Sequence, residues 1–420
     1  MRRAVVTGLG FITSIGNGRE EVSRSLRETR TGIEVFDELK RPGISVKLAG
    51  TVKGFAFPEW RSEEWTWPGD VQIPREQLRT MAPHGVYAFL AMREAIADAR
   101  LDGALVSHPR TGAMCASAGS TWLLYHHLDQ MVTRDIHRCY PLSMPASIAG
   151  TLNMNLTTAF RLKGATCGFS TACASSAHAF GAALDHIRLG RQDIVFVAGA
   201  EDCNYFSIVP FAGARALTTS GDPRVSPCAF DRKRDGFVVT GGATVLVLEE
   251  MEHAQKRGAH IYAEALGWGE ASDGFSVMAP EPNGEGLARA MQNALADSKI
   301  LPEEIDYINA HGTSTAAGDA AEIRAIKTLF PAEKRPRVSS TKSITGHGLS
   351  LAGAMEAGFC CLALEQGFTP VSANITDLDP ECAGVPVVSA PVDFAPRTAM
   401  SNSSGFGGTN VALVLRKWAS

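Results

Sequence analysis

The sequence lacks paired cysteines. Its nine cysteines are odd in number, scattered over 420 residues and nowhere spaced as CxxC. This pattern argues against a disulfide framework and against a zinc site, so no metal is expected. We expect most of these cysteines to be reduced and buried as small hydrophobic side chains. They stand at positions 115, 139, 167, 173, 203, 228, 360, 361 and 382.

Long apolar runs and blocks of like charge are also missing. No stretch approaches the roughly 18 apolar residues of a membrane-spanning helix. The arginines of the N-terminal MRRAVVTGLG precede an apolar run that glycines interrupt, with no cleavage site of small residues, so a secretion signal is not expected. A net charge of -4 offers no general basic field for nucleic acid, and neither GxGxxG nor GxxxxGK[ST] occurs. We expect a cytoplasmic protein without membrane or nucleic-acid partners.

What the sequence does contain is an alternation of short apolar runs with longer, helix-like runs. Residues 3–10, 193–202 and 242–252 are predicted strands, and residues 87–101 a helix. Strands alternating with helices predict a layered α/β fold with helix-covered sheets. After about residue 256 the pattern starts again, with strands predicted at 259–269, 305–312, 335–343 and 410–418 and helices at 284–299, 318–330 and 350–367.

The chain length suits two domain-sized units or one large unit built from two similar halves. We place the halves at residues 1–255 and 256–420, and because no low-complexity linker separates them we expect them to pack as one unit. Residues 54–76 hold three tryptophans and three prolines and are predicted to form an inserted surface excursion.

Cys173 stands in STACASSAHAFGAAL, residues 170–184, immediately before a predicted helix. The positive end of a helix dipole favours a thiolate, and the small neighbours would let a carbonyl group approach. The alternative is a structural cysteine at a contact between helices. The local sequence leaves both interpretations open.

Three further loops carry polar groups or glycines. His311 follows one predicted strand, and His347 follows another, with Lys342 five residues earlier. Residues beyond the carboxyl ends of strands often form the sites of α/β proteins, although a capping loop or a surface lysine would look the same. Glycines around Phe406 predict a backbone that offers N–H groups to a ligand, or else a simple turn.

The second histidine adds to the chemistry that these loops predict. A cysteine with one histidine would fit a protease or a simple acyl transferase. Two histidines suggest a second task, the stabilisation of an anion on another reactant.

The motifs MRRAVVTGLG, STACASSAH, DRKRDGF, HIYAE, ASDG, HGTSTAAGD, TKSITGH and SNSSGFGGTN occur in this order along nearly the whole chain. This series resembles the β-ketoacyl-[acyl-carrier-protein] synthases, the elongating condensing enzymes of the thiolase fold, and most of all the synthase I type. The resemblance implies a five-layered α/β/α/β/α fold from two duplicated βαβαβαββ halves. It also implies a homodimer, with a heterodimer of related ketosynthases as the alternative.

By this resemblance, Cys173 accepts an acyl chain as a thioester, and the N–H groups of Cys173 and Phe406 form an oxyanion hole. His311 and His347 polarise the malonyl thioester and stabilise the enolate left when CO2 departs, after which the carbanion attacks the acyl thioester. His347 then has to be a neutral imidazole whose other ring nitrogen has a fixed partner. No metal or redox cofactor is implied, because phosphopantetheine arrives on the acyl carrier protein.

The resemblance also assigns supporting roles. Lys342 is expected to pair with Glu322 and to help order His311, and Phe406 is expected to act as a gate. Thr313 and Thr315 match threonines that bind the phosphopantetheine arm, and Asp319 and Glu356 match structural acids. Because acyl carrier proteins are acidic, a local basic patch is expected at the entrance. Its candidates are Arg75, Arg79, Arg134 and Arg138, with Glu76 where another base is expected.

Some positions depart from the family pattern. Ser404 replaces an aromatic residue, Ser350 and Leu351 replace smaller ones, and residues 54–76 exceed the usual length. We expect these changes to affect substrate range or partner choice before chemistry.

Three rival families each differ from this sequence in one feature. Chain-length-factor subunits lack the cysteine, thiolases use a second cysteine near the C-terminus, and synthase III enzymes have an asparagine in place of the second histidine. A ketosynthase of a specialised polyene or polyketide pathway remains an open alternative.

Overall fold

The computed structural model describes residues 1–138 and 141–419. Its main feature is an 11-stranded sheet with the order β11-β10-β12-β13-β9-β1-β8-β7-β5-β6, and β2 pairs with β1 at its side. The first half of the chain contributes β1 (Ala4–Thr13), β2 (Gly16–Asn17), β5 (Thr111–Ala116), β6 (Thr166–Phe169), β7 (Ile194–Glu201) and β8 (Gly242–Glu250). The second half contributes β9 (Ala263–Ser272), β10 (Tyr307–Asn309), β11 (Arg337–Ser339), β12 (Thr398–Gly405) and β13 (Thr409–Lys417).

The two halves of this sheet repeat one arrangement. Three parallel strands are followed by two antiparallel ones, as β6-β5-β7-β8-β1 in one half and β11-β10-β12-β13-β9 in the other. A short antiparallel pairing of Ala4–Val6 with Ala263–Ala265 joins them. The predicted boundary after residue 255 falls at the end of α10 (Met251–Lys256) and stays a prediction.

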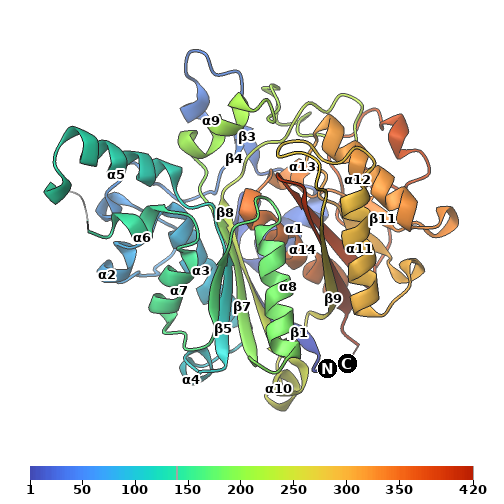
Figure 1. Cartoon of the computed structure of the whole chain (residues 1–420), viewed down its shortest axis with the longest axis horizontal. Helices are drawn as coiled ribbons and strands as arrows, with labels where there is room; N and C mark the ends of the chain where they lie inside the picture. The colour runs from blue at the N-terminus through green and yellow to red at the C-terminus, as the bar shows by residue number, and fades with distance from the viewer. Residues whose placement is uncertain (139–140, 420) are drawn as a thin grey trace.

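Helices form three layers around the two half-sheets (Figure 1). The outer face of the first half carries α3 (Pro83–Asp98) and α7 (Leu152–Phe160), and that of the second carries α11 (Glu285–Ser298) and α12 (Ala316–Leu329). Between the half-sheets lie α8 (Ser175–Arg188) and α14 (Ala352–Gln366). The five-layered α/β/α/β/α fold is therefore confirmed.

The central helix α14 is apolar almost all round, apart from the buried Glu356, because it has no solvent-facing side. All residues from Ala352 to Leu364 are buried, as expected for a helix enclosed by two sheets. The helix that it packs against most extensively is α8. A Cβ atom added to Gly353 would lie 2.6 Å from the backbone nitrogen of Ala177, so only glycine permits this approach.

The remaining elements lie around this framework. Within the described residues, no helix is long and apolar enough to cross a membrane. Strands β3 (Ile33–Val35) and β4 (Leu48–Gly50) form a separate ribbon. The other helices are α1 (Arg19–Glu28), α2 (Arg75–Leu78), α4 (Gly103–Val106), α5 (Thr121–Thr133), α6 (Ser143–Ser147), α9 (Tyr205–Gly213) and α13 (Lys342–Thr345).

The tryptophan-rich segment 54–76 is more than the surface excursion that its composition predicts. The Trp65 side chain is only 6% exposed, and its Nε1 donates to the carbonyl oxygen of Glu59 at 2.7 Å. Phe57 meets Trp65 edge to face at a centroid distance of 5.1 Å, and Phe55 meets Tyr87 of α3 at 4.8 Å. Most of the segment, which we call the aromatic lobe, is exposed, and these aromatic rings anchor it to α3 by burying apolar area.

Candidate active site

Cys173 lies in the turn between β6 and α8, two residues before the helix begins. The N–H of Thr171 donates to Ser175 Oγ at 2.8 Å, and that hydroxyl donates to the carbonyl oxygen of Ala172 at 2.6 Å. Ala172 adopts a φ of 49°, a left-handed conformation that a small side chain tolerates best. These contacts fix the turn and leave the Cys173 side chain 7% exposed.

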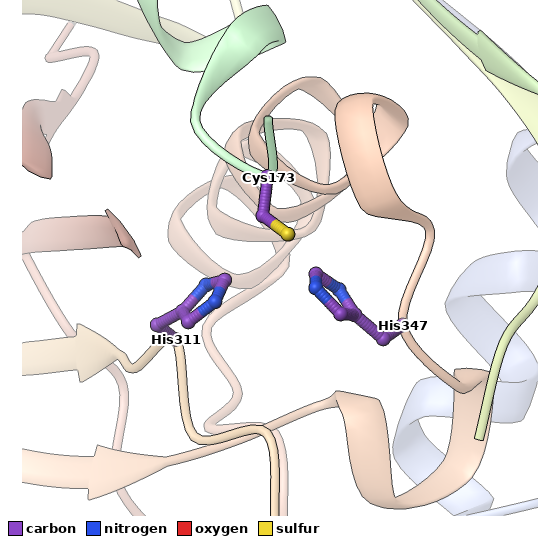
Figure 2. A group of neighbouring side chains, drawn as sticks. All are labelled: Cys173, His311 and His347. Atoms are coloured by element: carbon purple, nitrogen blue, oxygen red, sulfur yellow. The ribbon is translucent and has the colours of Figure 1, made fainter. Parts of the chain in front are cut away.

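Two histidines from the second half face this cysteine. His311 lies just after β10 and His347 just after α13, and Figure 2 shows both side chains pointing toward Cys173. Cys173 Sγ and one ring nitrogen of each histidine all lie within 4.8 Å of one another. The two imidazole rings meet edge to face with centroids 5.1 Å apart. The structure thus brings together three of the predicted site residues from both halves of the chain.

Both imidazoles are neutral. Burial lowers the pKa of His311 and of His347 well below the usual histidine value, and the nearby Lys342 ammonium lowers both further. Among the described residues, the Nδ1 atoms of both histidines are buried without a hydrogen-bond partner. The fixed partner expected for the other ring nitrogen of His347 therefore stays a prediction.

The Cys173 thiol is protonated in this conformation. Burial raises its pKa to about 12, against the opposing effects of the Lys342 charge and of the Phe406 N–H, which donates to the sulfur. Stabilisation of the thiolate by the helix start stays a prediction, and burial outweighs it in this conformation. The reason is that the free-energy penalty of removing a thiolate from water exceeds the stabilisation that the nearby dipoles and charges provide.

Lys342 pairs with Glu356 rather than with Glu322. Its Nζ forms an ion pair with Glu356 Oε1, and the two side chains are 1% and 0% exposed. Both Glu322 oxygens are already occupied, since they accept the N–H of His311 at 2.9 Å and of Gly312 at 2.7 Å. The expected pairing is wrong, whereas Glu322 itself orders the His311 backbone.

The loop after His311 is fixed by a buried acid. Asp319 accepts the N–H groups of Phe230 at 2.8 Å and Ser314 at 3.0 Å, and burial raises its pKa to about 7. On the same loop the hydroxyl oxygens of Thr313 and Thr315 lie 3.0 Å apart. Asp319 therefore holds the turn from which both threonines project.

One cavity of about 280 Å³ unites these groups, since it is lined by Cys173, both histidines, Thr313, Thr315 and Phe406. Phe406 is partly exposed at this cavity and packs against Phe211 with a centroid distance of 6.4 Å. Ser404, also in the lining, donates from Oγ to Asn410 Oδ1 at 2.7 Å. The departure at Ser404 thus adds a hydroxyl to the cavity wall and a cross-strand hydrogen bond.

The candidate carrier-docking arginines lie outside this cavity. Arg75 is exposed at the start of α2 and forms an ion pair with Glu63 at 3.2 Å. Arg79 is exposed directly after the last residue of that helix. Arg134 is exposed at the end of α5, and helices α2 and α5 lie on the same side of the molecule in Figure 1. The Arg138 side chain and all of Cys139 fall outside the described part of the structure.

Two buried contacts near Cys173 were missed by the sequence reasoning. Ser350 Oγ donates to Glu201, a buried residue at the carboxyl end of β7 whose pKa is raised well above the usual value by desolvation. The other departure, Leu351, is fully buried against Gly199. The position of Glu201 after a predicted buried strand was the available signal.

The second missed contact tethers the nucleophile turn. His178 lies on α8, and its Nδ1 lies 2.9 Å from Thr171 Oγ1 while its Nε2 lies 2.9 Å from Glu270 of β9. This histidine thereby links the Cys173 turn to the second half-sheet. Its place five residues after Cys173 in a predicted helix was the only hint.

Comparison with known proteins agrees with this geometry. The beta-ketoacyl synthase N-terminal domain matches residues 1–254, and the beta-ketoacyl synthase C-terminal domain matches residues 262–376. The 3-oxoacyl-[acyl-carrier-protein] synthase 1 of Escherichia coli (strain K12) is 41% identical over 99% of each chain. A solved beta-ketoacyl synthase from Burkholderia phymatum has a TM-score of 0.91 at 33% identity, and the ishigamide ketosynthase/chain length factor has 0.86 at 32%, each over 100% of both chains. The chain therefore belongs to the beta-ketoacyl synthase family.

Proposed function

We propose that the protein is a β-ketoacyl-[acyl-carrier-protein] synthase that extends acyl chains by two carbons in fatty-acid biosynthesis. The observation that carries this proposal is one thiol and two neutral imidazoles within 4.8 Å of one another in a single cavity. A thiol can hold an acyl chain as a thioester, and neutral imidazoles can donate hydrogen bonds to an enolate oxygen. The 41% identity to a synthase of this name over 99% of both chains favours this pathway over a specialised one.

The first half-reaction is acyl transfer. Cys173 Sγ attacks the thioester carbonyl of the acyl carrier, and the developing oxyanion is held by the N–H groups of Cys173 and Phe406. The carbon–sulfur bond to the carrier then breaks, and the carrier sulfur takes the proton that Cys173 gives up. Because the resting thiol is protonated, this proton has to leave as the carbon–sulfur bond forms.

The second half-reaction makes the carbon nucleophile. The malonyl carboxylate leaves as CO2, and its bonding electrons pass to the thioester oxygen, which His311 and His347 stabilise by N–H donation. The enolate carbon attacks the Cys173 thioester, the Sγ–carbon bond breaks, and the released sulfur takes up a proton from water. Imidazolium groups would give up their protons to the enolate too readily, so the low pKa of both histidines suits this role.

The partner in both steps is an acyl carrier protein, whose phosphopantetheine arm would pass Thr313 and Thr315 in the cavity wall. No further cofactor is required, because loss of CO2 drives the condensation. A reducing, cytoplasmic compartment suits the described cysteines, all eight of which are free.

The active form we propose is a homodimer. Strand β6 forms one end of the sheet, and its backbone edge is open to pairing in the described chain. Large apolar side chains are exposed on α5, α6, α7 and the short turn Ile136–Arg138, and a partner surface would cover them. They are Tyr125, Leu128, Met131, Val132, Ile136, Met144 and Met154. Light scattering after gel filtration at micromolar concentration checks this, and a monomer would contradict it.

Separated half-reactions test the proposed chemistry. Cys173→Ala should abolish acylation, seen as loss of the acyl mass shift in intact-protein mass spectrometry over a panel of acyl-carrier thioesters. Cys203→Ala, a change at a half-buried cysteine outside the catalytic cavity, should keep the shift. His311→Ala and His347→Ala should suppress release of labelled CO2 from malonyl-carrier protein more than they suppress acylation. Equal loss of both half-reactions would refute the division of roles, and normal condensation by Cys173→Ala would refute the function.

A further inference from the structure

The three catalytic side chains also have the composition of a transition-metal site. One cysteine sulfur and two imidazole nitrogens lie within 4.8 Å of one another, and all three side chains are buried. Tetrahedral Zn²⁺ with bonds of about 2.3 Å to sulfur and 2.0–2.1 Å to nitrogen places its ligand atoms about 3.5 Å apart. Small rotations of the three side chains toward their common centre would bring the ligand atoms to that separation.

We propose that Cys173, His311 and His347 form an inhibitory Zn²⁺ site, with the fourth coordination position open toward the catalytic cavity. Sulfur and imidazole ligands select Zn²⁺ over Mg²⁺ and Ca²⁺, which prefer oxygen. On binding, the S–H bond of Cys173 breaks, its proton passes to water, and an Sγ–Zn bond forms. No atom changes its oxidation state, so no further reactant is required.

The surrounding charges permit a cation at this place. The Lys342 ammonium disfavours it, but this group is paired with the Glu356 carboxylate inside the same buried cluster.

Zn²⁺ at this position would occupy the acyl acceptor and both groups that stabilise the enolate. The inhibitory consequence rests on the proposed function, whereas the metal site itself rests only on the geometry. Since an acyl thioester on Cys173 removes the sulfur ligand, metal and acyl chain have to exclude each other. Acylated protein should therefore resist Zn²⁺ that blocks the free protein.

Cobalt offers a direct probe of the site, because tetrahedral Co²⁺ absorbs strongly in the visible range and a sulfur ligand adds a charge-transfer band in the near ultraviolet. Co²⁺ titration of the full-length protein should produce both signals at one equivalent per chain, and Zn²⁺ should displace them. Cys173→Ala should lose the sulfur band and weaken Zn²⁺ binding about 100-fold or more, since even loss of a residue behind a ligand costs about 10–100-fold. Cys167→Ala, which removes an exposed free thiol, should retain both signals.

The same test can be made without a substitution. Wild-type protein that is acylated on Cys173 should show no sulfur band with Co²⁺. A band that survives acylation or Cys173→Ala, or that disappears with Cys167→Ala, would overturn the proposal. Protein that condenses acyl and malonyl thioesters but shows no sulfur band refutes the metal site alone. Protein that binds Co²⁺ through Cys173 but does not condense refutes the proposed function alone.

Discussion

Replacement of Gly353 by alanine tests how the central layer positions the nucleophile. The added Cβ would lie 2.6 Å from the backbone nitrogen and 2.7 Å from the Cβ of Ala177 on α8. No side-chain rotation relieves a contact with backbone, so α14 and α8 have to separate by several tenths of an ångström. Overpacking of this kind costs about 3 kcal/mol. The better helix propensity of alanine stabilises the helix by about 1 kcal/mol, so the free energy of unfolding should fall by about 2 kcal/mol in total.

The same displacement should reach the catalytic groups. Cys173 precedes α8 by two residues, whereas His311 and His347 stand on the opposite half-sheet, so a shift of α8 changes the sulfur–nitrogen distances directly. Misplacement of reacting groups by about 1 Å can cost about 100-fold in rate. For a shift of several tenths of an ångström we expect condensation to slow about 10-fold.

Urea unfolding followed by circular dichroism measures the stability, and initial condensation rates measure the effect on the site. The matched control is Gly103→Ala at the start of α4, where an added Cβ meets no atom within 4 Å. That variant should unfold at or above the wild-type urea midpoint. If Gly353→Ala were as stable as Gly103→Ala, the close approach of the two central helices would not be the constraint described above.

Three further predictions concern the aromatic lobe and the groups behind the site. Burial lowers the pKa of His127 to about 4, so the unfolded chain takes up a proton at this residue below about pH 6.5 while the folded chain does not. The free energy of unfolding that this residue contributes above that pH is therefore lost as the pH falls toward 4. Between pH 7 and pH 5, the free energy of unfolding should fall by about 1 kcal/mol more in the wild type than in His127→Gln. Equal losses in urea titrations at the two pH values would contradict this. Trp65→Ala should cost about 3 kcal/mol in the same assay, because a large buried ring leaves a cavity, and a cost below about 1 kcal/mol would show that the lobe does not support the core. Ser350→Ala should cost about 1–3 kcal/mol because Glu201 loses a buried donor, and an unchanged urea midpoint would refute that role.

Much of the fold could be predicted because its strands are covered on both faces. The runs around β7 and β8 are apolar on consecutive residues, and every residue of both strands is buried. The convergence of His311 and His347 also follows from pattern, since their loops come after strands β10 and β11, which are parallel neighbours and end at the same edge. Loop positions after parallel strands could therefore be placed together without coordinates.

Other features depend on packing that no local pattern encodes. Glu322 and Glu356 are both acids on helices near Lys342, and which one pairs with it depends on how α12 and α14 cross the sheet. The Cys173 pKa depends on burial depth, which outweighs the helix dipole here. The predicted strand 335–343 is confirmed only at Arg337–Ser339, because the chain then turns into α13.

The pairing of β1 with β9 has a consequence for motion during turnover. It makes one continuous sheet of the two halves, and α8 and α14 fill the space between them, so no hinge separates Cys173 from His311 and His347. Substrate entry therefore has to be controlled by the loops that cover the cavity, because the two halves of the chain do not move apart. The cover consists of the segment around Phe406 and the loop near Met278, joined where the N–H of Gly407 donates to the carbonyl oxygen of Val277 at 2.7 Å. Relaxation measurements should find exchange in these two loops, around reacting atoms that stay in place.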